Sequence, residues 1–186
     1  MTRIRMNLDG MWDFFVDPQQ RLRVGQLDQD GQPRQIKVPG PWQAQFQDLR
    51  QYTGVAWYRK RFSLSSRAAA HPPSETTFVL HFGAVDYFAT VWLNGVQIGE
   101  HEGGYLPFEL VLNSALRIEG ENELVIRVID PGDDVDAFSE YPFTEIPHGK
   151  QSWYGPVGGI WQSVYVEARH TVHITRLHIT PDVPNE

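Results

Sequence analysis

The sequence of 186 residues contains no cysteine, so neither a disulfide framework nor a thiolate metal site can form. It also lacks any apolar run approaching the roughly 20 residues that a membrane-spanning helix needs. The opening segment, MTRIRMNLDG, has no apolar stretch of the kind found in secretory signal peptides. These absences predict a cytoplasmic protein with no membrane partner.

Positive charge is also scarce. The chain has 16 Lys and Arg residues against 23 Asp and Glu residues, which gives a formal net charge of −7. Nucleic-acid-binding proteins usually carry a basic patch or stripe, and the sequence supplies none. We therefore expect no nucleic-acid partner. Apolar residues still make up 41% of the chain, which is enough to build a core.

Helical periodicity is almost missing. The only candidate helix is QAQFQDLRQY (43–52), which is one to two turns long. Apolar and polar residues instead alternate with the period of two that is typical of strands. The candidate strands are 55–64, 76–82, 86–93, 123–129, 160–168 and 171–180, separated by the turn signals LNGV, IEGEN, DPGDD and GPVGG. This spacing predicts an all-β fold, a jelly-roll β-sandwich of two packed antiparallel sheets.

Asn94-Gly95 lies between two of these apolar segments, in VWLNGVQIG. Asn-Gly is the strongest short hairpin signal, because a type I′ turn needs positive φ at both central residues. The segment predicts a tight hairpin. The following EHEGGYLPFEL would then lead to the next strand, with Tyr105, Pro107 and Phe108 capping one edge of the sandwich.

The hairpin segment VWLNGVQIGEHEGGYLPFEL resembles the signature of the N-terminal sugar-binding domain of glycoside hydrolase family 2. That family includes β-galactosidases, β-glucuronidases and β-mannosidases. Other landmarks resemble the family in the same order, namely LDGMWDFFVDP (8–18), IKVPGPWQAQ (36–45), YTGVAWYRKRF (52–62), GENELVIRV (120–128) and GGIWQSVYVE (158–167). The resemblance covers about residues 8–170.

The resemblance implies a galactose-binding-domain-like jelly roll over residues 1–170. Residues 171–186 would be a final strand or linker leading to an immunoglobulin-like domain and a catalytic (β/α) barrel. The implied function is a non-catalytic domain that completes the sugar pocket of an O-glycosyl hydrolase, with carbohydrate and those two domains as partners and with no cofactor. An autonomous carbohydrate-binding module is the alternative.

Catalysis by this chain alone would require two carboxylates flanking a sugar ring. Asn122-Glu123 superficially matches the Asn-Glu of the family's acid/base, but it lies in EGENELV, a polar turn entering a strand. The acidic stretch DPGDDVD reads as a solvated loop, with a weak cation site as the alternative; its acids are Asp130, Asp133, Asp134 and Asp136. His173 and His178 fall on opposite faces of a strand and make a poor ligand pair. We expect no catalytic residue and no metal ligand here.

The segment FTEIPHGKQSWYGPVGGIW (143–161) is the best candidate for sugar binding. It is long, unpatterned and rich in Gly, Pro and aromatic residues, as binding loops on rigid scaffolds often are. Trp153 and Tyr154 could stack on the apolar face of a pyranose, while Lys150 and Gln151 could hydrogen-bond its hydroxyls. GKQSW also resembles glucuronidase-like family members, in which this loop contacts the terminal sugar.

The chain departs from that pattern between Ser152 and Gly159. The family places a sugar-binding Asp before its Gly-Ile pair, but here WYGPVG contains no acid, so a galactose or glucuronate preference does not carry over. WYGP also resembles part of the β-mannosidase motif. Trp153 could instead simply pack beneath the loop. Gln51 stands where the resemblance places a polar residue near the same pocket, although it could instead be simply an exposed loop residue.

Overall fold

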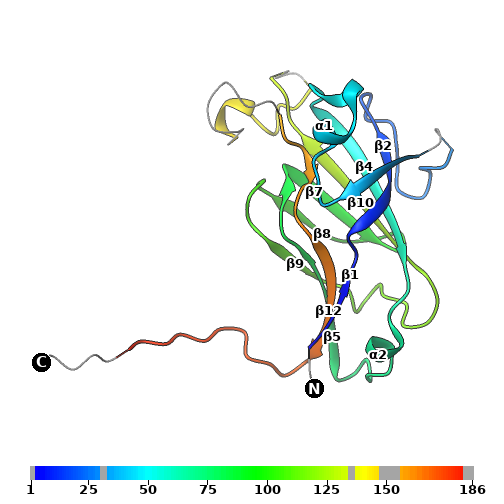
Figure 1. The fold of residues 1–186 in the computed structure, drawn as a ribbon, viewed down its shortest axis with the longest axis vertical. Coiled ribbons are helices and arrows are strands. Elements are labelled where there is room, and N and C mark those ends of the chain that lie inside the picture. The colour runs from blue at the N-terminus through cyan, green and yellow to red at the C-terminus, as the bar shows by residue number, and fades with distance from the viewer. Residues whose placement is uncertain (1–2, 30–32, 134–136, 147–155, 182–186) are drawn as a thin grey trace, which may run out of the picture.

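The computed structural model describes residues 3–29, 33–133, 137–146 and 156–181. These residues form two packed antiparallel sheets and one short two-stranded ribbon (Figure 1). The strand orders are β3-β2-β4-β10-β7-β8, β1-β12-β5-β9 and β11-β6. The strands are β1 (Ile4–Asn7), β2 (Gly10–Val16), β3 (Arg34–Val38), β4 (Gly54–Phe62), β5 (Thr76–Phe82), β6 (Val85–Asp86), β7 (Phe88–Leu93), β8 (Val96–Glu102), β9 (Phe108–Val111), β10 (Asn122–Asp130), β11 (Gly159–Ile160) and β12 (Val164–His170). The predicted all-β sandwich is confirmed.

Helices are few and short within the described residues. They are α1 (Trp42–Gln45), the 3-10 turn η1 (Gln47–Leu49), α2 (Ser66–Ala69) and the 3-10 turn η2 (Phe143–Glu145). The first two match the helical segment predicted at 43–52. The sequence pattern did not indicate α2, a single turn whose N-cap Ser65 accepts a hydrogen bond from the Ala68 amide. Across the part of the chain that the structure describes, no helix has the length and apolar character to cross a membrane.

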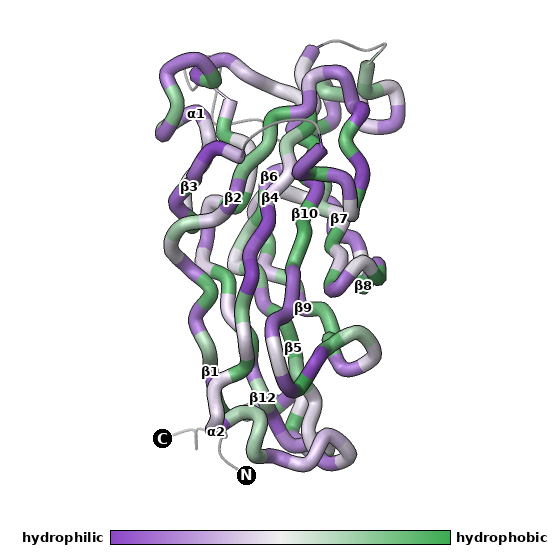
Figure 2. Tube along the Cα trace, turned by 90° about the vertical axis from the view of Figure 1, so that its right-hand side faces the viewer, coloured by the Kyte–Doolittle hydropathy of each residue, from purple (hydrophilic) through white to green (hydrophobic). Residues whose placement is uncertain are grey.

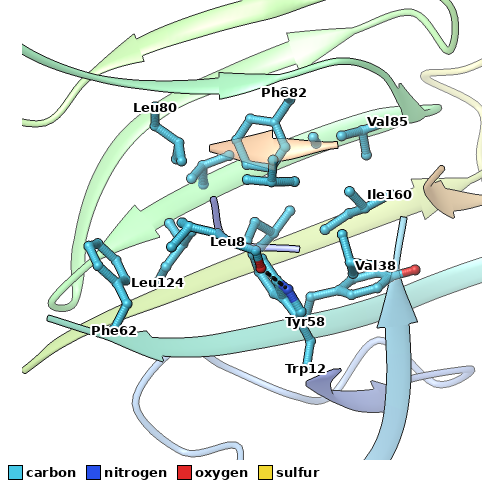
Figure 3. Close-up of a cluster of buried hydrophobic side chains, with 14 of the residues drawn as sticks. Leu8, Trp12, Val38, Tyr58, Phe62, Leu80, Phe82, Val85, Leu124 and Ile160 are labelled. Carbon is cyan, nitrogen blue, oxygen red and sulfur yellow. Dashed lines mark hydrogen bonds between the residues drawn. The ribbon is translucent and has the colours of Figure 1, made fainter. Parts of the chain in front are cut away.

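The main core lies between the two large sheets. In Figure 3, Leu80 and Phe82 of β5 face Leu124 of β10 and Tyr58 of β4, and each of the four side chains is at most 1% exposed. Each such burial stabilises the fold by about 1.5–3 kcal/mol. The Trp12 indole donates a hydrogen bond of 2.9 Å to the Leu8 carbonyl, so its one polar atom is satisfied inside the core.

A second apolar cluster covers the opposite face of the six-stranded sheet. It contains Phe15, Leu22, Leu27, Val55, Trp57, Val125 and Ile129. Asp17 shapes the loop that supplies two of these side chains, because its carboxylate accepts hydrogen bonds from the backbone amides of Arg21 and Leu22. The same carboxylate accepts a bond of 3.0 Å from the Trp57 indole. Strands β4 and β10 are therefore buried on both faces, whereas apolar and polar residues interleave along the chain as a whole (Figure 2).

The hairpin predicted at Asn94-Gly95 is confirmed. Strands β7 and β8 pair across these two residues, whose φ angles are +52° and +83°. The Asn94 side chain also donates hydrogen bonds to the Ala115 carbonyl and the Asn122 side chain, and it accepts one from the Glu123 amide. Asn122 is fully buried in this network and has a structural role, in agreement with the interpretation of Asn122-Glu123 as a strand entry.

Three predicted strands need correction. The strand at 86–93 is split into β6 and β7 at Tyr87, and the strand at 160–168 is split into β11 and β12. The predicted strand at 171–180 is not formed. No described strand lies beside it to complete a ladder, and Val172, Ile174, Leu177 and Ile179 are more than 70% exposed. Alternation alone therefore indicated a strand where the pairing partner is missing.

Candidate functional site

Three connecting segments, before β4, after β10 and before β11, meet at the end of the sandwich where α1 lies, at the top of Figure 1. Strand β4 begins here with Gly54, and β10 ends beside it, because Asp130 pairs with Gly54. The short ribbon joins the same end: Gly159 of β11 pairs with Asp86 of β6, and the Tyr87 amide donates to the Ile129 carbonyl. Three stretches of chain, before β4, after β10 and before β11, are thus brought together.

Gln43 of α1 connects these three stretches. Its Nε2 donates hydrogen bonds of 3.1 Å to the Tyr52 carbonyl and 3.1 Å to Asp130 Oδ2. Its Oε1 accepts a hydrogen bond of 2.9 Å from the Gly158 amide. One half-buried amide therefore holds the turn before β4, the end of β10 and the approach to β11.

Gly158 and Gly159 leave no room for side chains. A Cβ atom on Gly158 would collide with the Asp130 carboxylate and the Trp42 ring, and one on Gly159 would collide with the Tyr58 hydroxyl. Gly159 also has a φ of +100°, a conformation that side-chain-bearing residues rarely adopt. The Gly-Gly pair lets the chain pass directly over a buried polar floor.

Two carboxylic acids form this floor, Asp86 and Asp130, each 8% exposed. Burial raises the pKa of Asp86 to about 7. Burial also raises the pKa of Asp130 well above its ordinary value, and the nearby Asp86 charge raises it further, while the hydrogen bond from Gln43 acts in the opposite direction. Two neighbouring buried carboxyl groups disfavour ionisation of both at once. Asp86 and Asp130 together therefore retain a proton at pH values where exposed carboxyl groups are already ionised.

The expectation that Asp130 belongs to a solvated acidic loop was wrong. Asp130 is the last residue of β10 and shares the inward-facing parity of Leu124, Ile126 and Val128. Continuing the alternation of Leu124, Ile126 and Val128 by two residues would have placed Asp130 on the buried face. Asp133 is exposed as expected, whereas Asp134 and Asp136 lie outside the described residues. Within the described ranges, no group of three or more metal-ligating side chains is found.

Aromatic residues flank the acidic floor. The Trp161 indole donates a hydrogen bond of 2.8 Å to the Gly104 carbonyl, and Gly104 packs directly against the Asp86 carboxyl group. Tyr105 meets the edge of the Trp161 ring at 6.1 Å and is 51% exposed. Phe108, which was expected to cap one edge of the sandwich, stacks on the Phe82 ring at the start of β9. Sequence patterns did not single out Trp161 or Asp86.

The predicted sugar-contacting residues fall into two groups. Gln51 is exposed in the turn just before β4, next to the carbonyl of Tyr52 that Gln43 and Trp42 both hold. Lys150, Gln151, Trp153 and Tyr154 lie in segment 147–155, which is outside the described residues. Their roles stay predictions. The described chain resumes at Pro156, two residues before Gly158.

A rigid antiparallel sandwich with loops gathered at one end is a common scaffold for binding sites. The family model described as "Glycosyl hydrolases family 2, sugar binding domain" matches residues 5–166. The chain belongs to this family.

Individual relatives agree with this assignment. The chain is 29% identical to a β-glucuronidase of Canis lupus familiaris over 208 residues, which cover 100% of this chain and 32% of the relative. It is 32% identical to a β-glucuronidase of Paenibacillus borealis over 134 residues, covering 69% of this chain and 21% of the relative. A solved β-glucuronidase from Ruminococcus gnavus, in complex with D-glucaro 1,5-lactone, superposes with a TM-score of 0.70 at 25% identity, covering 89% of this chain and 29% of that one. The chain thus spans about a third of the length of these relatives or less.

Proposed function

We propose that this chain is the non-catalytic N-terminal domain of a family 2 glycoside hydrolase and completes the sugar pocket of a (β/α) barrel elsewhere in the same protein. The observation that carries this proposal is the family match over residues 5–166, combined with coverage of only about a third of the β-glucuronidase relatives. β-Linked glycosides are the substrate class. β-Glucuronides are the first to test, because the relatives described above are β-glucuronidases.

The buried acids support a non-catalytic role. Glycosidase carboxyl groups stand about 5–9.5 Å apart with a sugar between them. Asp86 and Asp130 are each 8% exposed, Gly158 packs against Asp130, and Gly104 packs against Asp86. Carboxyl groups buried to this extent are not presented to a sugar ring in the described chain. We infer that they shape the end of the sandwich and perform no hydrolysis themselves.

We propose that Gln51 and residues of the segment 147–155 contact the sugar. Gln51, Lys150, Gln151, Trp153 and Tyr154 are the proposed contacts, with polar groups for sugar hydroxyls and aromatic faces for stacking. Gln51 supports this proposal by its exposure at the turn that Gln43 holds. Such a set supplies one wall of a pocket, whereas ligand sites usually bury about 70–90% of their ligand. The remaining walls would come from the barrel and the immunoglobulin-like domain.

The test compares the full-length protein with the chain of residues 1–186 on 4-nitrophenyl β-glucuronide, β-galactoside and β-mannoside. We expect turnover of at least one substrate by the full-length protein, none by the chain, and millimolar or weaker monosaccharide binding by the chain in calorimetry. Micromolar binding by the chain would instead support an autonomous carbohydrate-binding module. Hydrolysis by the chain that disappears when one of its carboxylates is replaced would refute the non-catalytic role.

A further inference from the structure

Gln43 is placed to control the shape of the proposed sugar pocket without touching sugar. We propose that Gln43 is a positioning residue whose side-chain amide, anchored on Asp130, fixes the turn that carries Gln51 and the approach to β11 relative to each other. This inference rests on the proposed function, since its consequence is the binding of a glycoside. None of the sequence patterns marked Gln43.

The amide uses both of its ends. The two Nε2 hydrogens go to the Tyr52 carbonyl and to Asp130, each at 3.1 Å, while Oε1 takes the Gly158 amide at 2.9 Å. A Glu side chain at this position would lack both donors, and an Asn side chain would be one methylene shorter. The three partners are 9, 87 and 115 positions away along the chain. The Gln43 side chain therefore links segments that are distant in sequence.

Helix α1 holds the same segments at further points. The Trp42 amide donates a hydrogen bond of 3.3 Å to the Gly158 carbonyl, and the Trp42 indole donates one of 3.1 Å to the Tyr52 carbonyl. Gly158 has no side chain that could shift, and an added Cβ would strike both Trp42 and Asp130. Both segments therefore pack closely against α1, and Gln43 is the side chain that also ties them to Asp130.

Exchange of donor and acceptor provides a direct test. Gln43→Glu places a second acceptor against Asp130 and removes the donor to Tyr52. Gln43→Glu combined with Asp130→Asn restores a donor between the two side chains and retains the acceptor for the Gly158 amide. In the full-length protein, we expect Gln43→Glu to raise KM for the aryl glycoside about tenfold while kcat changes less than about threefold. The double variant regains the bond between the two side chains but not the bond to the Tyr52 carbonyl, so it should recover only part of the rise in KM.

Gln45 provides a matched control on the same helix. Its Nε2 donates to the carbonyls of Lys37 and Gly40, and its Oε1 accepts from the Lys37 amide at 2.8 Å. Gln45→Glu therefore loses comparable donors to the backbone, but its partners are Lys37 and Gly40 and not Tyr52, Asp130 or Gly158. It should lower the melting temperature and leave KM unchanged.

The outcomes separate this inference from the proposed function. If the parent full-length protein hydrolyses none of the glycosides, the proposed function is wrong and this inference falls with it. If the parent is active and Gln43→Glu changes KM no more than Gln45→Glu does, only the inference is overturned. A double variant that regains melting temperature while its KM stays as high as in Gln43→Glu would also reject the inference, because the contact with position 130 would then support the fold alone.

Discussion

Gly159 packs against the hydroxyl end of Tyr58, with its backbone at a φ of +100°. Gly159→Ala therefore adds both a collision and a strained conformation. We expect the free energy of unfolding to fall by about 2–4 kcal/mol, measured by denaturant unfolding. Gly120→Ala is the control, because Gly120 also has positive φ but nothing lies within 4 Å of its added Cβ. Equal losses at the two positions would contradict a steric role for Tyr58.

The pair of buried acids predicts a dependence of stability on pH. Asp86 keeps its proton up to a pKa of about 7 in the folded chain, whereas an unfolded Asp loses it near pH 4. The folded state therefore loses stability as pH rises from about 4 to about 7. Asp86→Asn should remove a loss on the order of 3 kcal/mol and raise the melting temperature at pH 7.5 but not at pH 4. Asp133 is exposed, so Asp133→Asn is the control and should leave the melting temperature unchanged at both pH values. If the pH dependence of stability is the same in Asp86→Asn as in the parent, Asp86 is not the group responsible.

The Asn94 turn allows conformation and hydrogen bonding to be separated. Asn94→Gly keeps the positive φ and loses the bonds to Ala115, Asn122 and Glu123, while Asn94→Ala loses the bonds and also strains the turn. We expect the Gly variant to lose about 1–3 kcal/mol of unfolding free energy and the Ala variant about 1 kcal/mol more. Chemical denaturation of both variants measures the difference. An Ala variant as stable as the Gly variant would show that the turn is not conformationally demanding.

The proposed loop contacts are tested in the full-length protein. If Gln151 and Trp153 meet the terminal sugar, Gln151→Ala and Trp153→Ala should each lower kcat/KM by roughly 5- to 150-fold with little change in melting temperature. If Trp153 instead packs beneath the loop, its replacement costs about 3–5 kcal/mol of stability and leaves kcat/KM normal. Unchanged kinetics in both variants would reject the loop as a sugar contact.

Much of the sandwich was predictable because period-two alternation reports directly on which face of a strand is buried. Leu124, Ile126 and Val128 were placed on one face by alternation, and all three are fully buried, although Val125 and Ile129 show that the other face of β10 is covered as well. The turn at Asn94-Gly95 was equally predictable, because its backbone demands that residue pair. Alternation carries no information about pairing partners, which is why the segment 171–180 was wrongly expected to be a strand.

The candidate site was less predictable because its contacts join distant positions. Gln43 looks like an ordinary polar residue of a short helix until the fold brings Gly158 within 2.9 Å of it. Asp130 looked solvated because its neighbours in sequence are acidic, although its parity is that of the core. The aromatic and polar composition of segment 143–161 indicated chemistry suited to sugar, but composition does not place a side chain.

The pairing of β1 with β12, in which Ile4 lies opposite Ala168, has a consequence for how the protein is made. The two strands are about 160 positions apart, so the four-stranded sheet cannot close until the ribosome has synthesised the whole stretch between β1 and β12. Contacts between such distant positions slow folding, because most of the chain must be drawn into a loop before they form. During that interval the unpaired edges of β1 and β5 are exposed to other chains. A nascent chain that pauses before β12 has left the ribosome would be a substrate for chaperones, whereas one in which β12 has emerged can complete the four-stranded sheet.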